Sequence, residues 1–197
     1  TTGSGRKLIG EIVNADLVID EISAHARAAV DLQPNVDTII EVGGQDSKFT
    51  SLREGRVTFS RMNTVCAAGT GSFLEEQADR LGIPISEFAD LAIGSKSPLT
   101  SDRCTVFMER DINCFLSRNY ETPEILAGSA HSVCENYLLK VASEGHIGSV
   151  IVFQGATAKN RALVAAFEQK LGRGVFVSRY CHLTGAYGAA LSLIESE

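Results

Sequence analysis

Two runs of apolar and β-branched residues lead into glycine-containing corners, and this pattern restricts the folds that the chain can adopt. Residues 36–42 run into Gly43 and Gly44, and residues 149–153 are followed two positions later by Gly155. Such runs are typical of buried strands, and glycine lets backbone N–H groups approach a bound phosphate closely. In open α/β sheets, nucleotides bind at the carboxyl ends of strands. The two corners together predict an α/β fold with a divided nucleotide site, although a hairpin without a ligand would also use the glycine pair.

The rest of the chain alternates between strand-like and helix-like patterns. A meander of three strands is predicted at residues 36–42, 47–52 and 57–61, with a turn at residues 53–55. We expect a capping box at Ser72 to begin one helix, and Thr122 to cap another. Apolar spacing predicts helices at residues 19–32, 72–81, 84–92, 105–116, 122–141, 159–171 and 184–194, and a short strand at residues 175–177.

Two cysteines lie just before predicted helices. Cys66 stands in the segment CAAGTG and Cys104 in the segment CTVF. A thiolate near a helix N-terminus is stabilised by unpaired N–H groups, which suits metal ligation or redox chemistry. Two cysteines cannot close a four-iron cluster, but two subunits could each contribute a pair across a two-fold axis. We expect structural roles for the other three cysteines, Cys114, Cys134 and Cys181.

Composition excludes several classes of function. The chain has 197 residues, of which 44% are hydrophobic and 21% charged, as in ordinary globular proteins. A net charge of −6 leaves no basic surface for a nucleic-acid backbone, and no apolar run reaches the roughly 18 residues of a membrane span. Five cysteines at irregular spacing argue against a secreted disulfide framework. We therefore expect a cytoplasmic protein that binds neither nucleic acid nor membrane.

Five motifs resemble those of one protein family over nearly the whole chain. They are EVGGQDSK at residues 41–48, NTVCAAGTG at 63–71, CTVF at 104–107, GATAKN at 155–160 and GAYGAA at 185–190. The family is that of the activator ATPases of 2-hydroxyacyl-CoA dehydratases, with the related ATPase subunits of benzoyl-CoA reductases. The resemblance implies the ribonuclease H-like fold of the superfamily of acetate and sugar kinases, chaperones and actin, in which two halves clasp ATP.

The resemblance also implies cofactors and residue roles. A homodimer would hold one [4Fe–4S] cluster through two cysteines of each subunit, matched here by Cys66 and Cys104. ATP or ADP would bind with Mg²⁺, for which Asp46 is the candidate ligand, although a local ion pair with Lys48 is the alternative. Glu21 or His25 would position water or phosphate, unless both belong to an ordinary helix face. The nucleotide-binding candidates are Gly43, Gly44, Gln45, Asp46, Lys48, Gly155, Ala156, Lys159 and Asn160.

The chain departs from the family pattern in three places. Residues 1–35 contain no counterpart of the first phosphate loop, so we expect a piece of a longer polypeptide that binds ATP weakly by itself. Glu41 replaces a usual Asp, as in the long, multidomain activases, and Ala156 replaces a frequent glycine. We divide the chain into a remnant of the first half with its connecting helix (residues 1–34), a second half (35–183) and a closing helix (184–197).

The function implied by the resemblance is ATP-driven electron transfer. ATP would close the two halves, and the cluster would pass an electron from a ferredoxin or flavodoxin to a 2-hydroxyacyl-CoA dehydratase or a similar iron–sulfur reductase. Two alternatives come from other classes: a sugar or N-acetylamino-sugar kinase without a cluster, and a non-catalytic assembly domain. A need for Cys66 and Cys104 in metal binding would separate the activator from both.

Overall fold

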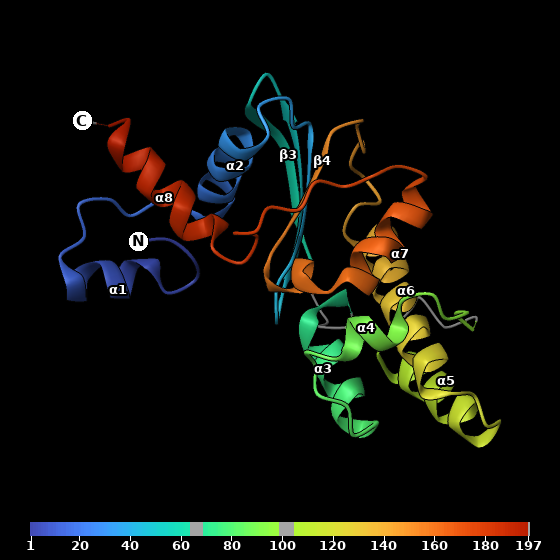
Figure 1. Ribbon diagram of the computed structural model, residues 1–197. Helices are drawn as coiled ribbons and strands as arrows, with labels where there is room; N and C mark the ends of the chain where they lie inside the picture. Colours follow the sequence, from blue (N-terminus) through green and yellow to red (C-terminus); the bar gives the residue numbers. More distant parts are fainter. Residues whose placement is uncertain (64–68, 99–104, 197) are drawn as a thin grey trace.

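The computed structural model describes residues 1–63, 69–98 and 105–196, which form a mixed sheet between two layers of helices (Figure 1). The strand order is β3-β2-β1-β4. β2 pairs antiparallel with β1 and β3, whereas β4 pairs parallel with β1. This confirms the predicted α/β class and the three-strand meander. The strands are β1 (Thr38–Val42), β2 (Ser47–Arg53), β3 (Arg56–Met62) and β4 (Ile151–Gln154).

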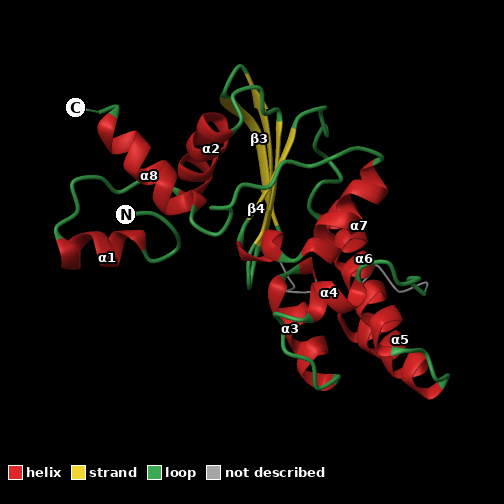
Figure 2. Ribbon diagram, in the orientation of Figure 1, coloured by secondary structure: helices red, strands yellow, loops and turns green. Residues whose placement is uncertain are grey.

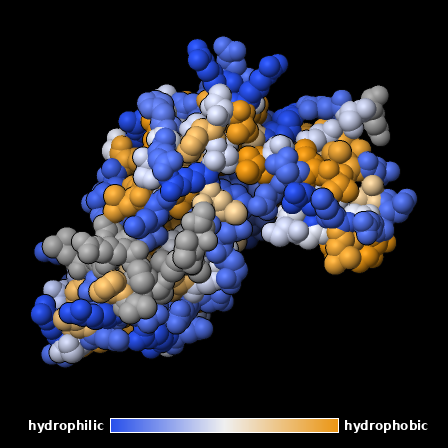
Figure 3. Space-filling view, turned by 180° about the vertical axis from the view of Figure 1, so that it is seen from behind, coloured by the Kyte–Doolittle hydropathy of each residue, from blue (hydrophilic) through white to orange (hydrophobic). Residues whose placement is uncertain are grey.

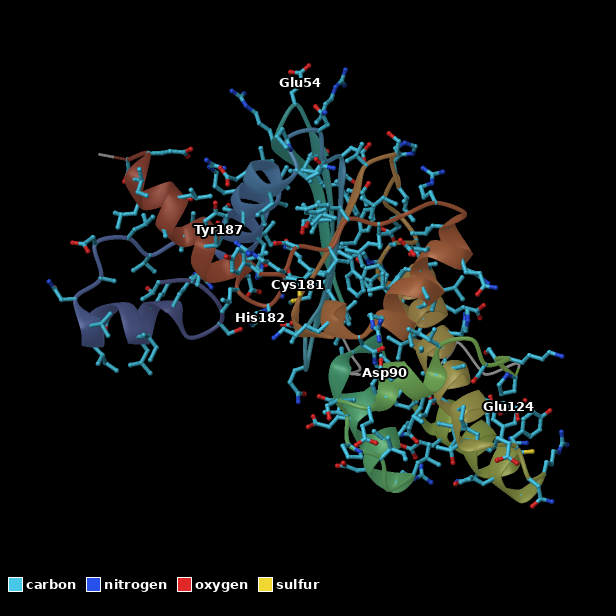
Figure 4. All side chains as sticks on the ribbon, in the orientation of Figure 1. Glu54, Asp90, Glu124, Cys181, His182 and Tyr187 are labelled. Carbon is cyan, nitrogen blue, oxygen red and sulfur yellow. The ribbon has the colours of Figure 1, made fainter. Side chains whose placement is uncertain are left out.

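The turn between β2 and β3 has two residues with positive φ. Glu54 stands at the tip of this hairpin with a φ of 53°, and Gly55 follows with a φ of 74° (Figure 4). Arg53 and Arg56 pair directly across the turn. Two successive left-handed residues are typical of the two-residue turns that match the twist of a hairpin. The predicted turn is therefore confirmed.

One face of the sheet is covered by α2 (Glu21–Leu32) and α8 (Thr184–Ile194), and α1 (Arg6–Val13) lies beyond them (Figure 2). A Cβ atom added to Gly188 would lie 1.7 Å from the carbonyl oxygen of Ala24. Because only glycine permits this approach, α8 packs directly against the backbone of α2. The two ends of the described chain thus meet in one helical layer.

The opposite face is covered by α6 (Thr122–Lys140) and α7 (Arg161–Leu171). The ring of Phe167 on α7 packs against two other buried rings, with centroids 5.4 Å from Tyr137 and 5.0 Å from Phe153. These contacts join α6 and β4 to α7, so the main core lies on this side of the sheet. Three further helices extend from this layer: α3 (Gly71–Arg80), α4 (Phe88–Ala92) and α5 (Thr105–Ser117).

The start of α3 differs from the prediction. Thr70 is the N-cap, and Ser72 lies inside the helix, so the predicted capping box is wrong. The amides of Gly71 and Ser72 donate instead to the carbonyl oxygens of Gly43 and Gly44, at 2.8 Å each. A helix start leaves backbone N–H groups without intrahelical partners, and here a distant corner supplies the acceptors. No local sequence pattern records that arrangement.

Other boundaries also shift. Glu121, rather than the predicted Thr122, is the N-cap of α6, and its amide donates to Oε2 of Glu124 at 3.0 Å. The strand predicted at residues 175–177 reduces to a single parallel bridge between Val152 and Phe176. Helix α1 was not predicted at all, because its eight residues lie in a short glycine-containing stretch.

An apolar surface lies on the helical layer that contains α1 and α8 (Figure 3). Leu8, Ile12, Val13 and Ile194 are each more than half exposed there.

None of the helices in the described ranges combines the length and the hydrophobicity that a bilayer-spanning segment requires.

Candidate functional site

The two glycine corners meet at one pocket of about 440 Å³. Gly44 lines it from the corner after β1, and Lys159 and Asn160 line it from the short 3₁₀ turn η2 (Ala156–Lys159) and the residue after it. These segments lie more than 100 residues apart in the sequence and come together because β1 and β4 are parallel neighbours. The structure thus brings both predicted corners to one site.

Apolar and polar side chains both line the pocket. Leu74 of α3 and two residues near the start of α4, Ile85 and Ala89, form its apolar wall, and the polar residues Glu75 and Ser86 follow Leu74 and Ile85 in the lining. The volume lies within the range of about 300–1,000 Å³ that is usual for small-molecule sites. A lining that combines apolar side chains with Lys159 fits a ligand that carries both a flat ring and anionic groups.

Three backbone segments converge behind the pocket without room for side chains. Gly155 has a φ of +96°, and a Cβ atom there would lie 2.2 Å from the carbonyl oxygen of Val42. A Cβ atom on Gly71 would lie 2.8 Å from Cγ2 of Thr157. The Thr157 hydroxyl donates to the same Val42 oxygen at 2.6 Å. The corner after β4 is therefore fastened directly to the end of β1.

The two glycines of the first corner differ in their hydrogen bonds. The Gly43 amide donates to the carbonyl oxygen of Asp46 at 2.8 Å. Within the described residues no acceptor contacts the Gly44 amide, and a Cβ atom on Gly44 would have nothing within 4 Å. Gly44 is therefore the better placed of the two to present its N–H to an anion. Gln45 faces α3, where its Nε2 donates to the Ser72 hydroxyl at 2.8 Å.

Beside this corner lies a cluster of charged side chains centred on Lys48 of β2. Its Nζ is 3.1 Å from Oε1 of Glu41 and 3.2 Å from Oδ1 of Asp46. A third carboxylate, that of Glu21 at the start of α2, lies 3.4 Å away. The Lys48 side chain is only 4% exposed. Its burial favours the neutral amine, but the carboxylate of Glu41, followed by the other two, raises the pKa of Lys48 above its ordinary value.

The cluster continues towards α8 and β4. His25 lies with Nε2 3.5 Å from Oε1 of Glu41 and Nδ1 2.9 Å from the hydroxyl of Thr184. Burial lowers the pKa of His25, and the opposing attraction of the Glu41 carboxylate does not offset this. Gln154 donates from Nε2 to Oε2 of Glu41 at 3.4 Å. Glu41 therefore links β1, β2, β4 and α2.

The structure places the sequence candidates in two groups. Gly44, Ala156, Lys159 and Asn160 line the pocket, whereas Glu21, Asp46 and Lys48 form the charged cluster beside it. Asn160 also caps α7, where its Oδ1 accepts from the amides of Ala162 and Leu163. The suggested Asp46–Lys48 ion pair is present, but it is shared with two further carboxylates.

Sequence reasoning missed the central position of Glu41 and overlooked Gln154 and Thr184. Glu41 was singled out only because it replaces an aspartate. The sequence signal for Gln154 is its place directly after the predicted buried strand at residues 149–153, and the parallel register of β1 and β4 then sets it opposite Glu41. Nothing local to Thr184 indicates its contact with α2.

Of the five cysteines, Cys66 and Cys104 lie outside the described residues. Cys134 and Cys181 are buried, and Cys114 is partly buried. Cys181 is labelled in Figure 4. Burial raises the pKa of Cys134 to about 12, so its thiol stays protonated, as suits a structural residue. In residues 1–63, 69–98 and 105–196, no three His, Cys, Asp or Glu side chains are arranged to hold a metal ion.

Residues 1–192 match the BadF/BadG/BcrA/BcrD ATPase family. The (R)-2-hydroxyglutaryl-CoA dehydratase activating ATPase of Acidaminococcus fermentans is 37% identical over 191 residues, which are 96% of this chain and 72% of that protein. The 2-hydroxyisocaproyl-CoA dehydratase activator of Clostridioides difficile is 36% identical, over 96% of this chain and 71% of its own.

Solved structures give the same grouping. The A. fermentans (R)-2-hydroxyglutaryl-CoA dehydratase component A superposes with a TM-score of 0.92 at 36% identity, over 99% of this chain and 74% of its own. The C. difficile activator, determined with bound ADPNP, superposes with a TM-score of 0.89 at 35% identity, over 99% of this chain and 72% of its own. Ethanolamine utilization protein EutJ, at a TM-score of 0.56 and 18% identity, shares the fold alone.

Proposed function

Since this chain belongs to the BadF/BadG/BcrA/BcrD ATPase family, we propose that it binds ATP between its two glycine corners and serves as the ATP-dependent activator of a 2-hydroxyacyl-CoA dehydratase. The resemblance drawn from the sequence motifs is confirmed at the level of the family and of the fold. The observation that carries the site assignment is the convergence of Gly44 with Lys159 and Asn160 on one pocket beside the Lys48 cluster.

The roles of individual residues follow from this placement. Gly44 would present its amide to a phosphate, and Lys159 would supply a positive charge on the other side. Leu74 and Ile85 would contact the adenine ring, whose flat faces suit the apolar wall. Asp46, two residues after Gly44 and 41% exposed, is the carboxylate available to a magnesium ion that neutralises the phosphates.

We further propose that Cys66 and Cys104 of each subunit of a homodimer hold a [4Fe–4S] cluster. The support is the position of each cysteine in a family motif before a helix, and the family membership itself. The cluster would supply a low-potential electron, received from a ferredoxin or flavodoxin and passed to the dehydratase or to a related iron–sulfur reductase.

Serine substitution of either ligand tests the cluster. We expect Cys66→Ser and Cys104→Ser to lose most of the iron bound after anaerobic purification and to shift the dimer towards monomer, because a shared cluster couples metal retention to association. Iron analysis and sedimentation velocity on the same samples measure both effects. Cys114→Ser is the matched control and should retain iron. Full iron in either ligand variant would exclude the shared cluster.

A second test concerns coupling between nucleotide and cluster. In the iron-loaded protein, ATP with magnesium should change the rate at which a chelator removes iron, and Asp46→Ala should abolish the change while iron content stays the same. A ligand shifts a conformational equilibrium only if it binds the two states differently, and the Asp46 contact with magnesium would provide that difference. Chelation followed by visible absorbance gives the rates.

Asp79→Ala, which removes an exposed carboxylate of α3, is the control and should behave like the parent. If ATP leaves the parent's chelation rate unchanged while a sugar is phosphorylated, the chain is a kinase and the proposed function is excluded.

A further inference from the structure

The ammonium group of Lys48 is shared between carboxylates with different access to solvent. Asp46 is 41% exposed and belongs to the corner that faces the pocket, whereas Glu41 is 9% exposed and lies inside the sheet. Glu21, 23% exposed, belongs to α2 in the layer on the other face. One buried cation therefore joins the pocket side of the sheet to the helical layer.

The charges in this cluster do not cancel. Three carboxylates surround one ammonium at distances of 3.1–3.4 Å from Nζ, with hydrogen bonds to Glu41 and Asp46 and an ion pair with Glu21. The backbone of Lys48 is held by the buried Tyr137 hydroxyl, which donates to its carbonyl oxygen at 2.7 Å. With the backbone fixed, the side chain can alter how it shares its protons without a change in the strand.

We infer that Lys48 is a positioning residue that divides its ammonium between Asp46 and Glu21, and so links magnesium–nucleotide binding at the corner to helix α2. The inference rests on the proposed nucleotide site. When a divalent cation binds the Asp46 carboxylate, the Lys48 ammonium interacts with Glu41 and Glu21 alone. Its ion pair with Glu21 of α2 then becomes stronger. Linkage requires the converse as well: the Glu21 contact favours release of Asp46 to the metal.

Removing the Glu21 charge should therefore weaken metal–nucleotide binding. In Glu21→Gln, Lys48 has lost one of its three carboxylate partners and holds Asp46 more strongly against the metal. We expect the affinity for Mn²⁺ in the presence of saturating ADP to fall by about three- to tenfold. Calorimetric titration of the full-length protein with Mn²⁺, used in place of Mg²⁺, gives the affinity. Asp31→Asn removes the same charge further along α2, where the carboxylate pairs with Arg27, and should change the affinity little.

A double-substitution cycle separates this route from a general charge effect. In an Asp46→Asn background, Glu21→Gln should have no further effect, because Lys48 no longer competes with the metal for a carboxylate. Hydrogen exchange gives a second readout: Mn²⁺–ADP should slow exchange in the first turn of α2 in the parent, and not in Glu21→Gln.

Each outcome decides a different point. Equal Mn²⁺ affinities in the parent and in Glu21→Gln would overturn the inference and leave the nucleotide site in place. The same loss from Glu21→Gln in both backgrounds would overturn it too, because a long-range charge effect explains that result. No binding of Mn²⁺–ADP by the parent would overturn the nucleotide site, and this inference with it.

Discussion

Replacing Lys48 with methionine is expected to lower the free energy of unfolding by about 3–5 kcal/mol, the usual range when one partner of a buried ion pair is removed. The methylene stem of methionine fills most of the same space, so the loss comes from the charge. Glu41, at 9% exposure, would keep its carboxylate inside the sheet without a cation. Asp46 and Glu21 reach more solvent and would contribute less. Urea unfolding followed by circular dichroism measures the change.

Two matched variants test the cause of this destabilisation. Lys170→Met removes an ammonium that is 50% exposed and paired with Glu135, and should cost less than about 1 kcal/mol. Combining Lys48→Met with Glu41→Gln removes the buried Glu41 charge together with its cationic partner. The double variant should recover much of the lost stability. If Lys48→Met costs no more than Lys170→Met, the cluster does not behave as a buried ion pair.

Gly155→Ala is the second substitution with a large expected effect, a loss of at least about 3 kcal/mol. The backbone there has a φ of +96°, which strains any side-chain-bearing residue, and the added Cβ atom would lie 2.2 Å from the Val42 oxygen. Since that oxygen also accepts from Thr157, the corner must move away from β1 or β1 must bend. Thermal and urea unfolding measure the loss, and nucleotide binding should fall with it.

Gly172→Ala is the control for Gly155→Ala. Both glycines have a positive φ, but only at Gly155 would the added Cβ atom also meet a close contact. Gly172 ends α7 with a φ of +66°, and nothing lies within 4 Å of a Cβ atom added to it. The substitution should cost only the left-handed conformation, about 1–2 kcal/mol. A loss at Gly155 no larger than the loss at Gly172 would mean that the corner accommodates a side chain, contrary to the packing described above.

Much of the fold could be predicted because it depends on the backbone preferences of residues that are close together in the sequence. The run of β-branched residues that ends at Gly43 and Gly44 predicts a strand and its corner, since each residue's own backbone preference favours that conformation. The turn at Glu54 and Gly55 was predicted for the same reason. The start of α3 was not: Ser72 has the residue type of a cap, but Gly43 and Gly44 accept the amides that a cap would satisfy.

The sequence by itself determined the strand meander, the two glycine corners, the family and the list of nucleotide-site candidates, because these depend on local backbone preferences and on motifs. Only the tertiary structure decided how those candidates divide: Gly44 and Asn160 line a pocket, whereas Asp46 forms an ion pair with Lys48. The Lys48 cluster takes its carboxylates from a helix, a strand and a loop. Its geometry depends on how closely α2 approaches the sheet, a distance set by packing between layers that no single segment encodes.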